Sequence, residues 1–220
     1  MVCCMIKSTA GHRVLGTWFS FVRATTTRQR FAFSASCGSE RLETEIQQAN
    51  ERYAGKISIR RASDNKGWGL FALQRFQKGS LVIRANALSE SSKQDSHSVQ
   101  TSWNSHVTMD LPARSINHVC DEANVGIQPN SLGAFDFFAL REISIEEELT
   151  WDYETSEYEI SHGFACACGA ASCRGELQGF RYHGPKVLEK LMESSGLHRS
   201  FWKIEKTMMM TPIVLCCPDL

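Results

Sequence analysis

Three cysteines within ten residues constrain this chain more than any other feature of its sequence. The segment "CACGAASCRG", residues 166–175, spaces them as C-x-C-x4-C in a loop rich in glycine and alanine. Of the nine cysteines, three precede residue 40 and two follow "MMMTP" near the end, so Cys120 is the remaining candidate to join Cys166, Cys168 and Cys173. The odd number and uneven spacing argue against a disulfide framework and favour reduced thiols.

Four converging thiolates would suit a zinc ion. Zinc takes four sulfurs in a tetrahedron at about 2.3 Å, and such a closed site contributes folding free energy instead of chemistry. The alternative is that these cysteines are ordinary small buried thiols. Because the C-x-C-x4-C pattern is unusual for core packing, we predict a structural zinc site that ties residues 166–173 to the distant loop around residue 120.

Charge is distributed unevenly along the chain. Residues 1–39 contain five basic residues and no acidic one, although the 220 residues together are neutral. This segment is also rich in Ser and Thr, which is typical of an organelle transit peptide; a secretory signal or a disordered tail are the alternatives. We therefore expect residues 1–45 to be a basic leader. The expected location is intracellular and reducing, in a mitochondrion or plastid, with nucleus or cytoplasm as the alternative.

The rest of the composition excludes some function classes. No run approaches the roughly 18 apolar residues of a membrane-spanning helix, so no membrane role is expected. The part after the leader is acidic and lacks a basic stripe, so direct nucleic-acid binding is not expected either. Short strand-like runs dominate ("KISIRR", "LVI", "ELTWDY"), and "SVQTSWNSHVTMD" predicts a hairpin that turns near Trp103 and Asn104. The "GPKVLEKLMESSG" segment predicts a C-terminal helix with Pro185 in its first turn.

Three further motifs are weak when each is taken alone. "GWG", residues 67–69, is most simply a bend between strands, and a dinucleotide-binding fold is disfavoured because position 72 is Ala and no helix pattern follows. In "RSINHVCDEAN", residues 114–124, the asparagine and histidine are individually best explained by turn capping and surface exposure. A tyrosine that ends a strand, as in "ELTWDY", is usually a rim residue.

Together, however, the motifs resemble a SET-domain protein lysine methyltransferase with a post-SET zinc segment, over residues 56–177. "GWG" is similar to the family's Gly-x-Gly, "INHVC" to its Asn-His-x-Cys, "EEELTWDY" to its Gly-Glu-Glu-Leu-Thr-Tyr/Phe-Asp-Tyr, and "CACGAASCRG" to its post-SET cysteines. The resemblance supplies Cys120 as fourth zinc ligand independently. It implies a mainly β fold (the β-clip fold) of small antiparallel sheets with a pseudoknot. Residues 56–160 would be the SET domain, 161–178 the post-SET segment, and 179–220 a C-terminal helical extension.

The same resemblance implies S-adenosylmethionine as methyl donor and the side-chain amine of lysine in a protein as acceptor. Tyr153 would be the catalytic residue whose hydroxyl orients donor and amine, and Trp151 would line the lysine channel. Leu177 would cover the donor's adenine or simply pack in the core. The remaining implied donor-binding residues are Gly67, Trp68, Gly69, Asn117 and His118.

Three departures from the family pattern keep a second function class open. "NHVCDEAN" lacks the family's proline, and its Asn124 lies one residue farther along. Glu146 replaces a glycine, which would cost on the order of 1 kcal/mol if the position needs a positive φ. Trp151 stands where Tyr or Phe is usual. The alternative to an active enzyme is therefore a catalytically weak SET-like module that binds S-adenosylmethionine or a protein partner.

Overall fold

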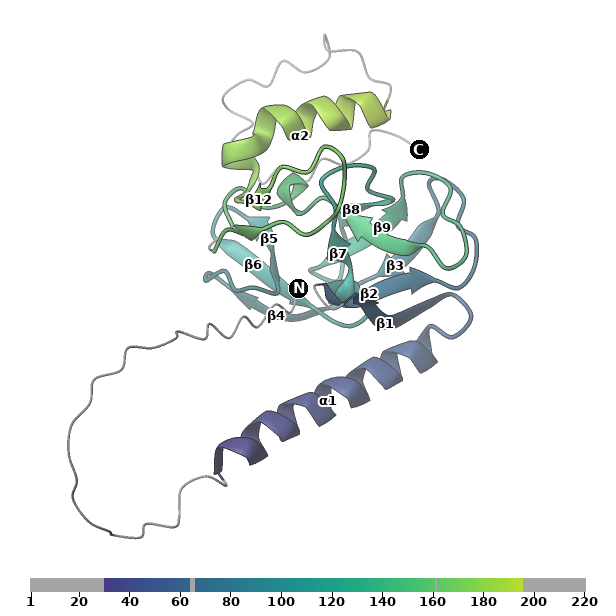
Figure 1. Cartoon of the computed structure of the whole chain (residues 1–220), viewed down its shortest axis with the longest axis vertical. Coiled ribbons are helices and arrows are strands. Elements are labelled where there is room, and N and C mark those ends of the chain that lie inside the picture. Colours follow the sequence, from purple (N-terminus) through teal and green to yellow (C-terminus); the bar gives the residue numbers. More distant parts are fainter. Residues whose placement is uncertain (1–29, 64–65, 161, 196–220) are drawn as a thin grey trace, which may run out of the picture.

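The structure, a computed structural model, describes residues 30–63, 66–160 and 162–195. Within these residues, short strands form four small sheets, and two longer helices lie at the ends of the described chain (Figure 1). The predicted fold class, mainly β with small antiparallel sheets and a C-terminal helix, is confirmed. None of the described helices combines the length and the apolar character that crossing a membrane would require.

The helices are α1 (Arg30–Arg52) and α2 (Phe180–Ser195), with two short 3-10 helices, η1 (Ala113–Ser115) and η2 (Tyr153–Thr155). The strands are β1 (Ile57–Ser63), β2 (Gly67–Ala72), β3 (Leu81–Arg84), β4 (Ala87–Ser91), β5 (Ser98–Ser102), β6 (Ser105–Met109), β7 (Asn117–His118), β8 (Val125–Pro129), β9 (Phe135–Ala139), β10 (Glu148–Trp151), β11 (Phe164–Ala165) and β12 (Glu176–Leu177).

The four-stranded sheet brings the distant motifs together. Its order is β1-β2-β10-β7, so a strand from residues 148–151 lies between strands from residues 67–72 and 117–118. β10 runs antiparallel to β2 but parallel to β7, with Thr150 opposite Asn117 and Trp151 opposite His118. A parallel pair needs a long crossover connection, which residues 119–147 with strands β8 and β9 supply. The crossing places the "NH" and "WDY" motifs side by side.

The core fills the space between these sheets. Leu70 and Leu149 of the four-stranded sheet are fully buried, as are Phe135 and Phe137 of β9 in the β3-β9-β8 sheet. The predicted hairpin is also confirmed, because β5 and β6 pair antiparallel with Ser102 opposite Ser105 and Trp103 and Asn104 in the turn. The "GWG" segment differs from the prediction: it is not a bend but the start of β2, and Gly67 alone has a positive φ, 74°.

α1 was missed by the sequence analysis, which placed residues up to 45 in a leader. The helix starts at Arg30, and its second half packs on β1 through Leu42, Ile46 and Ala49, of which Ile46 is 6% exposed and Ala49 2%. The side-chain amide of Asn50 then bonds both the backbone N–H and C=O of Ile59, at 2.7 and 3.0 Å. Residues from about 42 onward therefore belong to the folded unit, whereas residues 1–29 lie outside the described part of the chain.

The C-terminal helix starts earlier than predicted. α2 begins at Phe180, which puts Pro185 inside the helix and not in its first turn. At the start of the helix, the N–H groups of Phe180 and Arg181, which have no acceptor within the helix, donate to the carbonyls of Glu157 and Tyr158 at 2.8 Å. Within α2, Val187 is fully buried. The helix covers the segment around β12 (Figure 1). The predicted end at Gly196 lies outside the described residues.

Candidate active site and cysteine cluster

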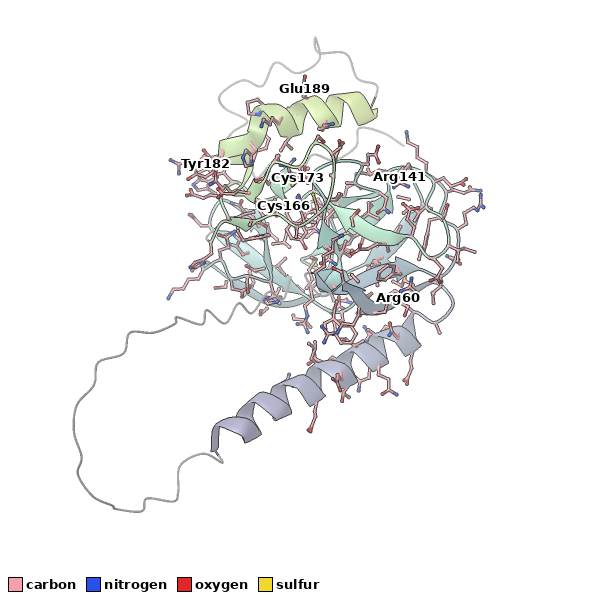
Figure 2. All side chains as sticks on the ribbon, viewed as in Figure 1. Arg60, Arg141, Cys166, Cys173, Tyr182 and Glu189 are labelled. Carbon is pink, nitrogen blue, oxygen red and sulfur yellow. The ribbon has the colours of Figure 1, made fainter. Side chains whose placement is uncertain are left out.

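The four predicted cysteines meet in space. The sulfurs of Cys120, Cys166, Cys168 and Cys173 all lie within 4.8 Å of one another, although Cys120 comes from the loop after β7 and the others from the loop between β11 and β12. Figure 2 labels Cys166 and Cys173 below α2. Cys120 is buried, with 2% of its surface exposed.

The donor set fits a tetrahedral zinc ion. Four sulfurs about 2.3 Å from a central zinc are about 3.8 Å apart. The sulfur of Cys120 lies 3.7 Å from that of Cys166 and 4.0 Å from that of Cys173. Two backbone amides also point at sulfurs, Arg174 N–H at Cys120 and Gly175 N–H at Cys173, each at 3.4 Å. Amide donors of this kind stabilise thiolates, which is the form that binds metal.

A buried ion network connects this cluster to the "WDY" motif, and the sequence analysis did not find it. The Arg174 side chain, 3% exposed, pairs with Asp152 at 2.5 Å and with Glu154 at 2.7 Å, and also bonds the carbonyl of Cys120. Glu154 is fully buried and accepts further bonds from the Gln178 and Gly179 amides. Because Arg174 directly follows Cys173, the only sequence signal was the arginine of "CRG".

His118 lies between the cluster and the tyrosine. Its Nδ1 accepts the backbone N–H of Tyr153 at 3.2 Å, so the proton must sit on Nε2, which lies 3.2 Å from the Cys120 sulfur. Burial, together with the charges of Arg174 and Lys66, lowers the pKa of His118 to about 3, so the imidazole is neutral at physiological pH. Both ring nitrogens are therefore used within the chain.

Asn117 is more open to a ligand. Its Nδ2 donates to the carbonyl of Trp68 at 3.1 Å and to Glu148 at 2.8 Å, which joins β7 to the start of β2. Its Oδ1 accepts no hydrogen bond from the described residues. Gly69 fits against this pair, since a Cβ there would lie 2.9 Å from the Glu148 carboxylate and 3.0 Å from Asn117 Nδ2. Asn117, Gly69 and the backbone of Trp68 thus lie together beside one acceptor that a ligand could use.

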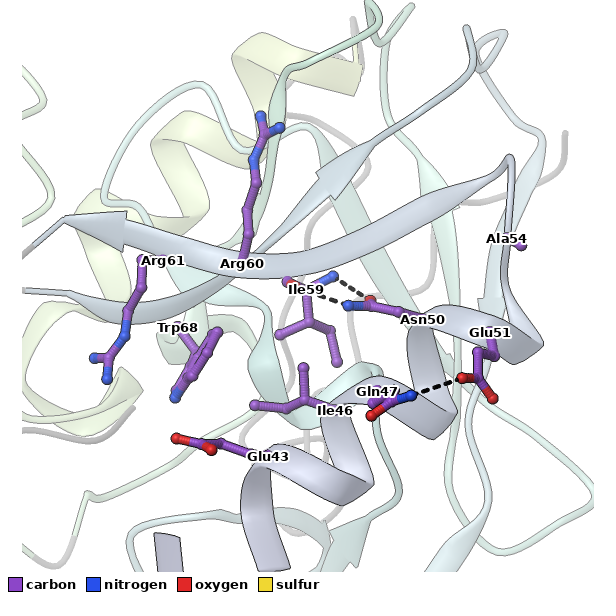
Figure 3. A pocket seen from close by; sticks show the side chains of 10 residues that line it. All are labelled: Glu43, Ile46, Gln47, Asn50, Glu51, Ala54, Ile59, Arg60, Arg61 and Trp68. Atoms are coloured by element: carbon purple, nitrogen blue, oxygen red, sulfur yellow. Dashed lines mark hydrogen bonds between the residues drawn. The ribbon is translucent and has the colours of Figure 1, made fainter. Parts of the chain in front are cut away.

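Trp68 is an exception among them, because its side chain faces elsewhere. It lines a groove of ≈ 520 Å³ between α1 and the β1–β2 hairpin, with Arg61 stacked 4.5 Å from its ring centre (Figure 3). Ile46 and Ile59 form the apolar floor, and Glu43 lies at the rim of the groove. This groove contains none of the other predicted site residues. Only the backbone of Trp68 lies beside Asn117.

Tyr153 and Trp151 share a second, smaller pocket of ≈ 120 Å³. Their rings lie 4.9 Å apart, and the Tyr153 hydroxyl donates to the carbonyl of Ile116 at 2.7 Å. Burial, aided by the nearby Glu148 carboxylate, raises the pKa of the Tyr153 phenol, so it stays protonated. Apolar side chains from β5, β6 and β11 form part of the walls: Val99, Met109 and Phe164. Polar side chains from residues 94–98, with Arg114 and Glu157, line the rest of the pocket.

Leu177, predicted either to cover the donor's adenine or to pack in the core, lies in β12, and its role toward the donor stays a prediction. It is fully buried in β12, opposite Phe164 of β11.

Two of the three departures from the family pattern, the altered loop after Cys120 and Glu146, have local explanations. After Cys120 the chain turns through Glu122, which has φ 54°. The turn brings Asn124 to a position where its side chain is fully hydrogen-bonded. Asn124, 1% exposed, bonds Glu147 and the backbone of Glu148 and Thr150 at 2.8–2.9 Å. Glu146 has φ 69°, as the replaced glycine would require.

Comparisons with known sequences agree with the predicted motifs. Residues 67–154 match the family model described as the SET domain. The histone-lysine N-methyltransferase SUVR4 of Arabidopsis thaliana is 29% identical over 157 residues, which are 54% of this chain and 32% of that protein. The histone-lysine N-methyltransferase ash1 of Drosophila melanogaster is 30% identical over 134 residues, 52% of this chain and 6% of that one. The chain thus spans a third or less of either relative.

Among solved structures, the chain is similar to KRYPTONITE in complex with mCHG DNA and SAH. The TM-score is 0.46 at 24% identity, covering 56% of this chain and 29% of that one. The methyltransferase domain of human SETMAR gives a TM-score of 0.44 at 22% identity, covering 56% and 58%.

Proposed function

We propose that this protein transfers a methyl group from S-adenosylmethionine to the side-chain amine of a lysine in a protein substrate. The observation that carries the proposal is the crossing of β7 and β10. It brings Asn117, on β7, next to β10, and the hydroxyl of Tyr153, just after β10, points to the carbonyl of Ile116 in a small pocket, within residues that match a SET domain. The two relatives named above are both histone-lysine N-methyltransferases, which supports the reaction class.

S-Adenosylmethionine supplies an already activated methyl group when bound, so the protein needs no covalent nucleophile. Asn117 Oδ1 would accept a hydrogen bond from the donor's amino group, and the Gly67–Gly69 backbone would lie alongside it. The cysteine cluster would hold zinc as a fixed crosslink between the loop after β7 and the β11–β12 loop.

The residues of the smaller pocket would act on the lysine. A free lysine amine has a pKa of about 10.4, and an apolar surrounding disfavours its charged form. Trp151 and its apolar neighbours provide this surrounding. The Tyr153 hydroxyl donates a hydrogen bond to the carbonyl of Ile116. The lone pairs of its oxygen are therefore left to accept a hydrogen bond from the lysine amine, which fixes the direction of the amine.

The test is methyl transfer from radiolabelled S-adenosylmethionine by the full chain loaded with zinc. Wild type should label protein substrates, and Y153F should lose at least about a hundredfold in rate because the orienting oxygen is removed. Calorimetric binding of S-adenosylmethionine to both proteins is the control. Equal rates for wild type and Y153F would contradict the assigned role of Tyr153.

The second candidate is a module that binds S-adenosylmethionine or a partner without efficient turnover. Two observations favour it. Both ring nitrogens of His118 contact other groups of the chain, and Trp151 stands where the family usually has Tyr or Phe. Normal donor binding without any labelled product in either protein would decide for it.

The substrate is proposed by comparison. The two relatives are named for histone lysines, whereas the basic composition of residues 1–39 favours an organellar protein. Purified histones and extracts of mitochondria or plastids should therefore be assayed in parallel. Label in the organellar extract alone would support the organelle location, and label in histones alone would support the nucleus.

A further inference from the structure

A buried carboxylate lies in the wall of the Tyr153 pocket, and neither the sequence motifs nor the proposed mechanism uses it. Glu157 is 5% exposed and lines the pocket together with Trp151 and Tyr153. The other carboxylate lining this pocket, Asp95, is exposed to solvent. Burying a carboxylate is costly unless its oxygens find donors, so its contacts identify what it holds in place.

Glu157 bonds two parts of the segment before and within β5. One carboxylate oxygen accepts the backbone N–H of Gln100 at 2.7 Å, and the other accepts the side-chain amide of Gln94 at 2.8 Å. Both partners are neutral amides. These bonds join residues 94–100, which line one side of the pocket, to the segment that follows Tyr153 on the other side.

The bonds are reciprocated from the opposite segment. Gln100 Oε1 accepts the backbone N–H of Tyr158 at 2.9 Å, and the Gln94 amide also donates to the carbonyl of Glu159 at 3.0 Å. The ring of Tyr158 in turn packs against Trp103 at the tip of the β5–β6 hairpin, 4.9 Å between ring centres. The two walls of the pocket are thus fastened by side chains and not by a strand ladder.

We propose that Glu157 is a positioning residue for the protein substrate. By clamping residues 94–100 to residues 157–159, it fixes the width of the pocket entrance and so decides which lysine-bearing segments fit. This inference rests on the proposed function. Without the Glu157 carboxylate, the wall formed by residues 94–100 would lose two of its bonds to the opposite segment and keep its pairing with β6 and the weaker remaining side-chain contacts, so the substrate would meet a wider, less ordered entrance.

A purely structural role for Glu157 is the alternative, and Asp136 offers a matched control. Asp136 is also a buried carboxylate, 6% exposed, held by Arg84 and Asn130. It lies on β9 and does not line the Tyr153 pocket. D136A and E157A should therefore both lower stability, but only E157A should alter the pocket.

The test uses the zinc-loaded full chain and a synthetic peptide library with a fixed central lysine and randomised flanks. The best wild-type peptide from the library then serves for kinetics, at a temperature where all variants are folded. E157A should raise KM about tenfold or more with kcat changed less than about threefold, because it disturbs positioning and not the reacting groups. E157Q, which keeps an amide oxygen for Gln100 N–H, should restore most of the loss. Q94A, a milder variant, should shift KM in the same direction.

Amide hydrogen exchange gives a readout that does not depend on turnover. The N–H groups of Gln100 and Tyr158 should exchange faster in E157A, near the wild-type rate in E157Q, and unchanged in D136A. Unchanged exchange at both amides in E157A, or equal KM changes in E157A and D136A, would overturn the proposal. If wild type labels no peptide, the proposed function fails. The amide hydrogen exchange of Gln100 and Tyr158 still tests whether Glu157 holds the two segments together.

Discussion

Glu146 stands at a turn position whose backbone favours glycine, and its replacement tests this geometry directly. The residue has φ 69° in the turn before β10, and its N–H bonds the carbonyl of Ala72 at 2.8 Å. A non-glycine residue in this region costs about 1 kcal/mol. Its side chain gains only an ion pair with Arg60 at 2.5 Å, in which the two side chains are 41% and 57% exposed. Such exposed pairs contribute about 0–1 kcal/mol.

Two variants separate the two effects. E146A removes the ion pair and keeps the strain, so it should be no more than about 1 kcal/mol less stable than wild type. E146G removes both and should be about 1 kcal/mol more stable than E146A, equivalent to about 2–4 °C in Tm. At high salt, where the ion pair is screened, E146G should also exceed wild type by about this amount.

Urea and thermal unfolding of the zinc-loaded protein measure the difference. Glu142 is the matched control, since it forms an exposed ion pair with Arg75 at an ordinary φ. There, glycine should be about 0.5–1 kcal/mol less stable than alanine, because it loses more chain entropy on folding. If E146G is likewise less stable than E146A, the turn does not hold the positive φ and the reasoning fails.

Three further perturbations test other parts of the molecule. C120S should abolish binding of one zinc per chain and increase exchange in residues 164–178, measured by metal analysis and hydrogen exchange, whereas C216S, outside the cluster, should retain the metal. Burial raises the pKa of Glu157 to about 7 from an unfolded value of 4.5, so the folded state binds a proton more tightly than the unfolded state. The free energy of unfolding of wild type relative to E157Q should therefore fall by up to about 3 kcal/mol as the pH rises from 4.5 to 7. A flat difference between wild type and E157Q over this range would contradict that pKa. I46A should cost about 2 kcal/mol or more in urea unfolding because its side chain is buried against β1, whereas the exposed Q48A should cost little; equal effects would mean that α1 does not pack on the sheet.

The sequence predicted most of the features that are encoded by short motifs. The cysteine spacing identified all four members of the cluster, and the replaced glycine anticipated the positive φ of Glu146. These features are local, or they depend on a chemistry such as metal binding that requires a fixed number of ligands. The roles assigned to Tyr153, Asn117 and their neighbours stay predictions until activity is measured.

Features that depend on tertiary contact were missed. α1 has only a thin apolar stripe at Leu42, Ile46 and Ala49 within a polar sequence, so its periodicity did not stand out from the leader. The glutamates of residues 146–159 are close together in the sequence, yet the structure gives them different surroundings. Glu146 pairs with Arg60, whereas Glu154 and Glu157 are buried. Nothing in "DYETSEYEI" distinguishes a buried carboxylate from an exposed one, because the difference lies in distant donors such as Gln94, Gln100 and Arg174.

The cysteine cluster and the tyrosine pocket are physically one unit. Arg174, next to Cys173, is paired with Asp152, the residue before Tyr153, and His118 bridges the Tyr153 amide to the Cys120 sulfur. A displaced Arg174 would leave Asp152 and Glu154 buried without their cation, an arrangement that typically costs several kcal/mol. The β11–β12 loop therefore cannot move away without destabilising the backbone that carries the tyrosine. The cysteine cluster and the proposed reaction site therefore share one strand crossing, and the order of the cluster is a condition for the geometry around Tyr153.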